Sequence, residues 1–78
     1  MVEIMEKPIY PAVVTREGVT WLISVDLTDF GPILAIADTD DDIQFMAHDV
    51  VRAYTDLKHE DFDITYSFVG GTPAWATV

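Results

Sequence analysis

The apolar residues of this chain repeat with two different periods, and the change between them limits which elements the chain can form. In residues 19–27 and 62–68 apolar and polar side chains alternate, as in a strand with one buried face. Residues 33–37 are all apolar, which is typical of a strand buried on both faces. In residues 43–57 the apolar positions follow the i, i+3, i+4, i+7 spacing of one helix face. The sequence therefore predicts strands on either side of a single helix.

Proline and glycine residues mark the remaining boundaries. Pro8 and Pro11 favour an edge strand at the start, because proline donates no backbone hydrogen bond. Gly18 offers the positive φ that a three-residue hairpin turn over residues 16–18 needs. The predicted order is β-β-β-α-β, an α+β fold in which an antiparallel sheet carries one helix, from about residue 40 to residue 57, on one face. The second face must then be polar or find a partner.

The length and the lack of cysteine limit how stable such a domain can be. Seventy-eight residues form one domain, in which we expect a leader over 1–8, a core over 9–69 and a tail over 70–78. A core of this size rarely supplies more than about 3–5 kcal/mol. Without cysteine there are no disulfides, so we expect a homodimer, a higher homo-oligomer or a bound partner to supply additional stability.

The charge balance excludes several classes of partner. Fourteen acidic and four basic side chains give a formal net charge of −10, which repels phosphate backbones and attracts a basic protein. We therefore expect no direct contact with nucleic acid. The sequence has no run of about 18 apolar residues and no secretory signal pattern, so we expect neither membrane insertion nor export. The absence of cysteine fits a reducing cytoplasm.

The acidic run over residues 38–42 admits two interpretations that involve a bound metal or phosphate. Alternate aspartates fit the start of a calcium loop, but its sixth and twelfth positions are Ile43 and Asp49 instead of glycine and glutamate. An apolar strand followed by Asp-x-Asp also opens the haloacid-dehalogenase phosphatases, whose fold needs a much longer chain. We favour a structural role, with Thr39 as N-cap and three aspartates that complement the helix dipole in the first turn: Asp40, Asp41 and Asp42.

Catalytic interpretations need residues that the sequence does not bring together. A ribonuclease-H-like site with two metal ions would require Asp26, Asp38 and a helix acid such as Asp49 to converge. His48 is expected on the polar helix face and His59 in a loop, both as surface residues without a metal or a base role. We therefore expect no catalytic residue, no metal and no cofactor.

Aromatic residues are the better candidates for function. Phe45 lies about 160° around the helix from Ile43, so it is opposite the core stripe and is either an ordinary exposed aromatic or an interface anchor. It is flanked by the other helix candidates, His48, Asp49 and Arg52. On the sheet, Trp21 and Tyr66 are alternative contacts on the uncovered face. Apolar side chains are also expected on that face, where they usually mark an interface: Val13, Leu22 and Val69.

The first hairpin resembles a known family. The stretch Tyr-Pro-Ala-Val-Val-Thr-Arg-Glu-Gly over residues 10–18, followed by Trp-Leu-Ile-Ser-Val over residues 21–25, resembles the opening of HicB-like antitoxins. The likeness covers roughly residues 9–69 and weakens after Leu27, because the loop over residues 26–31 lacks the family's Pro-Gly and the helix lacks its Glu-Glu-Ala. The resemblance implies a partial ribonuclease-H-like fold that is not catalytic.

The resemblance also implies a partner. HicB-like antitoxins neutralise a small basic mRNA interferase, the HicA toxin, by covering its catalytic surface, and an acidic chain suits that role. Complete antitoxins usually add a DNA-binding domain, which we do not expect after the short tail here. Three other hypotheses stay open: an orphan phage or mobile-element protein that self-assembles and inhibits a host protein, an acidic DNA mimic that acts by charge alone, and a vestigial ribonuclease-H-like metal nuclease. The contact candidates are Phe45, His48, Asp49, Arg52, Asp40, Asp41 and Asp42.

Overall fold

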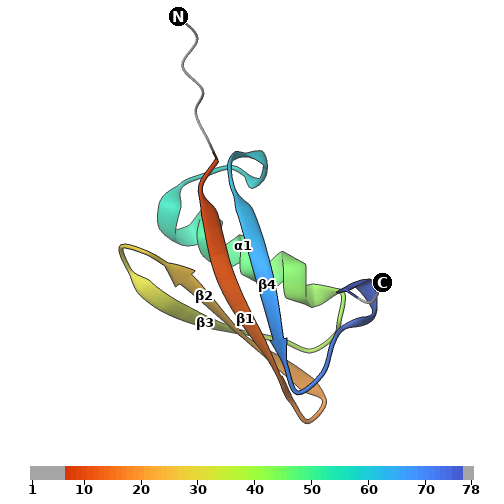
Figure 1. Ribbon diagram of the computed structural model, residues 1–78. Helices are drawn as coiled ribbons and strands as arrows, with labels where there is room; N and C mark the ends of the chain where they lie inside the picture. Colours follow the sequence, from red (N-terminus) through yellow and green to blue (C-terminus); the bar gives the residue numbers. More distant parts are fainter. Residues whose placement is uncertain (1–6, 77–78) are drawn as a thin grey trace, which may run out of the picture.

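The computed structural model of this protein describes residues 7–76, in which one α-helix packs on a four-stranded sheet (Figure 1). Residues 1–6 of the expected leader and 77–78 of the expected tail lie outside the described residues. The elements in chain order are β1 (Ile9–Glu17), β2 (Thr20–Leu27), β3 (Gly31–Ala37), α1 (Asp42–Thr55), the 3-10 helix η1 (His59–Asp61), β4 (Asp63–Val69) and the 3-10 helix η2 (Ala74–Ala76). The predicted α+β fold with the order β-β-β-α-β is confirmed.

The sheet is mixed, which corrects the prediction that it is antiparallel. Its strand order is β3-β2-β1-β4, and the first three strands form the expected antiparallel meander. β4, however, lies beside β1 and runs parallel to it. The reason is the connection, because a chain that leaves β3 through a helix can return to the far side of the sheet and enter it in the same direction.

The first turn is tighter than predicted. β1 continues through Glu17, which pairs with Thr20, so only Gly18 and Val19 form the turn between the two strands. Gly18 has φ of 62°, and a positive φ at the first of two central residues suits the twist of a hairpin. The expected three-residue turn over residues 16–18 was therefore wrong by its length, while the role of the glycine is confirmed.

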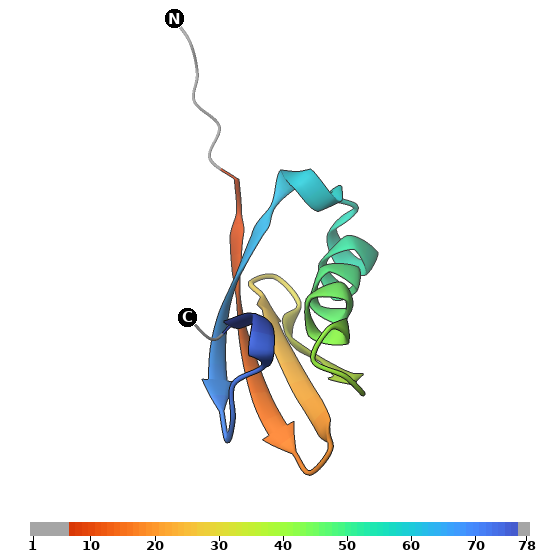
Figure 2. The same cartoon turned by 90° about the vertical axis from the view of Figure 1, so that its right-hand side faces the viewer.

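The alternating residues of β2 build the core. Trp21, Ile23, Val25 and Leu27 are all at most 1 % exposed and share one sheet face. The helix covers that face with its apolar stripe, which includes Ile43, Ala47, Val50 and Val51 (Figure 2). This arrangement fixes which face of the sheet is covered, and none of the described helices lies over the opposite one.

β3 differs from the prediction that it is buried on both faces. It lies at an edge of the sheet, and two of its side chains on the uncovered face, Leu34 and Ile36, are 63 % and 60 % exposed. Only Ala37, at the end of the strand, is fully buried. An apolar run therefore indicated a strand correctly but not its environment, because burial depends on what covers the second face.

The last described residues belong to the fold and extend the core past the expected boundary at residue 69. Pro73 is buried, and the Trp75 ring packs edge-on against the rings of Tyr66 and Phe68, with centroids 5.3 Å and 5.7 Å away. η2 thereby covers the part of the inner face that lies over β4. Within residues 7–76 no helix combines the length and the hydropathy needed to cross a bilayer.

Candidate functional site

The outward face of α1 gathers the helix residues that the sequence singled out. Phe45 is 66 % exposed, and Asp49 and Arg52 are exposed on the same side, while the apolar stripe of the helix faces the sheet. The predicted position of Phe45 opposite the core is therefore confirmed. We call this set of four residues the helix site: Phe45, His48, Asp49 and Arg52.

His48 is more enclosed than a surface histidine. Its ring is half-buried and packs against the rings of His59 and Phe62, with centroids 4.6 Å and 5.2 Å away. Its Nδ1 lies 2.8 Å from the carbonyl oxygen of Gln44, so Nδ1–H donates and, in the neutral ring, Nε2 is left as an acceptor. The aromatic stack fixes the ring beside Phe45, with Nε2 able to accept a hydrogen bond from a partner's donor.

Two shallow depressions flank this stack. One has a volume of about 330 Å³ and is lined by Gln44, Phe45, His48 and His59. The other, of about 480 Å³, shares His59 and is lined otherwise by Arg52, Asp56, Leu57, Lys58 and Glu60. An exposed aromatic side chain such as Phe45, next to shallow depressions, is a surface shape against which side chains of another protein can pack. The sequence did not indicate the part that η1 plays here, because His59 meets His48 only through the turn after α1.

Within residues 7–76 none of the carboxylates around the helix site forms an ion pair, although Arg52 lies on the same helix face. Asp41, Asp42 and Asp49 are all exposed. Within residues 7–76 the structure has a single ion pair, between Arg16 and Asp40. The negative charge on this side of the molecule therefore faces solvent, where it attracts positive charge on a partner.

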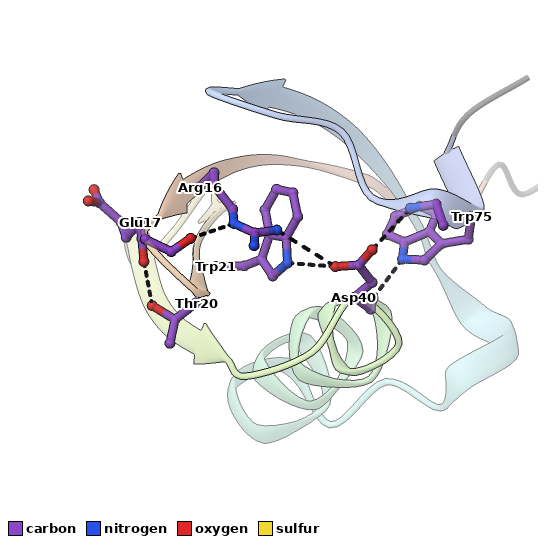
Figure 3. Close-up of polar contacts among 8 residues, drawn as sticks. Arg16, Glu17, Thr20, Trp21, Asp40 and Trp75 are labelled. Atoms are coloured by element: carbon purple, nitrogen blue, oxygen red, sulfur yellow. Dashed lines mark hydrogen bonds and ion pairs between the residues drawn. The ribbon is translucent and has the colours of Figure 1, made fainter.

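Asp40 has a different role from its neighbours (Figure 3). Its Oδ1 accepts a hydrogen bond from the indole N–H of Trp21 at 2.9 Å, and its Oδ2 accepts from the backbone N–H of Ala74 at 3.1 Å. Its backbone oxygen accepts from the indole N–H of Trp75 at 2.7 Å, and the Arg16 guanidinium is 4.0 Å from Oδ1. Asp40 therefore ties β2 and η2 to the start of α1, and neither of its carboxylate oxygens is left free.

The helix begins later than predicted, which explains why these aspartates differ. The N-cap position is held by Asp41 and not by Thr39, and no side chain caps it. Only Asp42 lies in the first turn. The helix ends at Thr55, where Asp56 takes a left-handed conformation with φ of 61°, two residues before the expected end at Leu57. The three aspartates therefore do not share one role at the helix dipole.

Trp21 and Tyr66 do not lie on the uncovered sheet face, and that prediction was wrong. Trp21 is 1 % exposed and aligns with the core residues of β2. Tyr66 pairs in register with buried Ala12, so its side chain points to the same inner face. Its hydroxyl is buried without a hydrogen-bond partner, and burial raises its pKa from 10.0 to about 12. The predicted outer positions of Val13, Leu22 and Val69 are confirmed by the same alternation.

The acids required for a metal site are not assembled. Over the described part of the chain, no group of three or more His, Cys, Asp or Glu side chains comes close enough to hold a metal ion. Asp26, Asp38 and Asp49 therefore do not converge as a two-metal site would need. The aspartates of residues 38–42 do not form a calcium cage either.

Comparison of the chain with protein-family models, with curated proteins and with solved structures gives no match.

Proposed function

We propose that this chain is a non-catalytic, acidic module that binds a small basic protein by direct contact through the helix site. The expected partner is a HicA-like mRNA interferase toxin, whose activity the contact would block. The observation that carries the proposal is an exposed aromatic side chain, Phe45, set among exposed carboxylates that form no ion pair within residues 7–76. Large aromatic side chains are common anchors of protein interfaces, and unpaired charge speeds the encounter with a partner of opposite sign.

The chemistry of the site suits a cationic surface in particular. Lysine and arginine side chains can approach the exposed carboxylates of Asp41, Asp42 and Asp49 without displacing an internal ion pair. In the neutral ring the Nε2 of His48 is a hydrogen-bond acceptor, because Nδ1 donates to the carbonyl oxygen of Gln44. Phe45 supplies the apolar contact that gives the encounter a defined geometry. Charge thus provides attraction, while the aromatic residue provides specificity.

Two further features support the choice of partner class. The β1–β2 hairpin carries the residues that resemble HicB-like antitoxins, and the order β-β-β-α-β is the one that this resemblance implies. A toxin that cuts mRNA acts in the cytoplasm, so we assign this chain to the same compartment. The lack of cysteine fits a reducing environment.

Co-expression with a HicA-like toxin tests this function. We expect the chain to co-purify with the toxin and to restore growth of toxin-arrested cells. Phe45→Ala should remove at least about nine-tenths of the affinity, since anchors of this kind contribute about 2 kcal/mol or more. Val19→Ala is the matched control, because Val19 is an apolar residue that is 81 % exposed but lies in the β1–β2 turn.

Absence of both co-purification and rescue would overturn the proposal. Binding that Phe45→Ala leaves unchanged would instead favour an inhibitor that acts by charge alone.

A further inference from the structure

The uncovered sheet face carries two rows of uncharged side chains that run across all four strands. One row is formed by Leu34, Ser24, Val13 and Ser67, and the next by Ile36, Leu22, Thr15 and Val69. We call these eight residues the outer patch. Four of its five apolar members are well exposed, with Leu34 at 63 %, Ile36 at 60 %, Val69 at 53 % and Val13 at 43 %, while Leu22 is half-buried. Figure 1 looks onto this face, with α1 behind the strands.

The outer patch itself carries no charged side chain. Among the described strand residues, acidic side chains on this face lie towards the ends of the strands, with Glu17 at one end and Asp26 and Asp63 at the other. The carboxylates of the helix side lie across the sheet from it, as the edge-on view shows (Figure 2). A basic partner would therefore gain less electrostatic attraction at the outer patch than at the helix side. A second chain of net charge −10 meets less repulsion here than at the helix side.

We propose that a second copy of this chain covers the outer patch, so that two sheets pack face to face in a symmetric homodimer. Two sheets packed in this way lie about 10 Å apart with their strands about 30° from alignment. In such a dimer the branched side chains of β3 and β2 interdigitate with those of the partner copy. Both helix sites then point outward, so dimer formation and binding at the helix site do not compete.

The size of the face allows a dimer of low affinity. Strands about 4.8 Å apart that rise about 3.3 Å per residue give the whole uncovered face, including the end rows beyond the outer patch, a footprint of roughly 440 Å², or roughly 900 Å² for two copies. Specific interfaces generally bury more than about 1,000 Å² of accessible surface. The accessible surface of the side chains is larger than the planar area of the sheet beneath them. The two acidic chains also repel at long range. The dimer should therefore dissociate on dilution and strengthen when salt screens the repulsion.

Sedimentation equilibrium of the full chain tests the proposal. Between about 10 µM and about 1 mM, the weight-average mass should rise from 8.7 kDa towards twice that value. The rise should begin at lower protein concentration in about 0.5 M salt than in about 0.05 M salt. The variant Leu34→Thr with Ile36→Thr should weaken the dimer at least about tenfold, because a two-fold interface contains each substitution twice.

Two further variants keep the result interpretable. Val13→Thr preserves the side-chain shape and the β-branched character, so a folded protein with a weaker dimer is expected even if the double variant unfolds. Val19→Thr and Phe45→Ala leave the outer patch intact and should dimerise like the parent chain. A monomer at every concentration and salt level would overturn the proposal. A dimer that the outer-patch variants do not weaken would also overturn it. So would a dimer that Phe45→Ala disrupts, or one that dissociates when the salt concentration is raised. These outcomes are independent of whether a basic partner binds.

Discussion

At the residue scale, Asp40 shows how the carboxylate and the backbone oxygen of one residue can join segments that are far apart in the sequence. Its partners Trp21 and Trp75 lie 19 and 35 residues away along the chain. Each indole brings a polar N–H into a largely apolar region, where an unpaired donor costs free energy. Asp40 accepts both hydrogen bonds and therefore allows two large aromatic residues to be part of the inner face.

Asp40→Ala is expected to lower the free energy of unfolding by about 1–3 kcal/mol, because it leaves the buried N–H of Trp21 without an acceptor. Asp40→Asn is the matched control. Its amide oxygen can still accept from Trp21 while its NH₂ group cannot accept from Ala74, so an intermediate loss is expected. Urea unfolding of the three proteins measures the difference. Equal stability of all three would contradict the role assigned to Asp40.

Tyr66 provides a second test at this scale, since its buried hydroxyl has no hydrogen-bond partner. Tyr66→Phe removes that hydroxyl and should raise the free energy of unfolding at pH 7 by about 1 kcal/mol. The pH dependence follows from the raised pKa. Below pH 10 the phenol is protonated in both states, whereas between pH 10 and about 12 it ionises first in the unfolded chain. The free energy of unfolding of the parent chain therefore falls as the pH rises through this range.

Thermal unfolding of both proteins at pH 7 and across pH 10–12 checks this expectation. The parent chain should lose stability faster than Tyr66→Phe as the pH rises. Parallel pH profiles would mean that the hydroxyl is solvated in the folded protein.

At the element scale, the periodicity of the sequence predicted the elements better than their surroundings. β2, α1 and β4 formed where the alternating and the helical spacing indicated, because one face of each packs on the core. β3 was expected to be buried on both faces, but nothing in the described structure covers its outer face. Whether another element covers a strand is set by the rest of the fold and is not encoded in the strand's own residues. The parallel pairing of β4 with β1 is likewise a property of the whole topology.

For the candidate site, too, the sequence predicted positions within one element but not contacts between elements. The 100° spacing of helical residues was enough to place Phe45 with Asp49 and Arg52 on the outward face. The packing of His48 on His59, and the use of Asp40 within the fold, depend on contacts between separate elements. Trp21 and Tyr66 were placed on the wrong face because an alternating pattern alone does not say which of its two faces the helix covers.

η2 offers a prediction for an element that the sequence suggested only as a tail. Trp75→Ala should lower the free energy of unfolding by about 2 kcal/mol, less than the roughly 3–5 kcal/mol of a fully buried tryptophan, because Trp75 is half-buried. Trp75→Phe retains a ring against Tyr66 and Phe68 but loses the hydrogen bond to Asp40, so it should cost less. Urea unfolding measures both, and an unaffected Trp75→Ala variant would show that η2 does not support the sheet.

At the scale of the whole molecule, the two sides of the sheet differ in the charge at their candidate contact surfaces. The helix side presents Phe45 among exposed carboxylates, and the outer patch is uncharged. The two proposed contacts therefore respond to salt in opposite ways. Binding of a basic protein at the helix site should weaken as salt rises, while self-association through the outer patch should strengthen. A small chain can in this way use both faces without competition between them.

The most direct measurement of the proposed function is isothermal titration calorimetry of the chain with a HicA-like toxin at about 0.05 M and about 0.5 M salt. We expect saturable binding that weakens with salt, and a Phe45→Ala variant that binds at least about tenfold more weakly at both salt levels. Val19→Ala should match the parent chain. An absence of binding at either salt concentration, or a Phe45→Ala variant that binds as tightly as the parent, would contradict the proposal that this chain recognises a basic partner through its helix site.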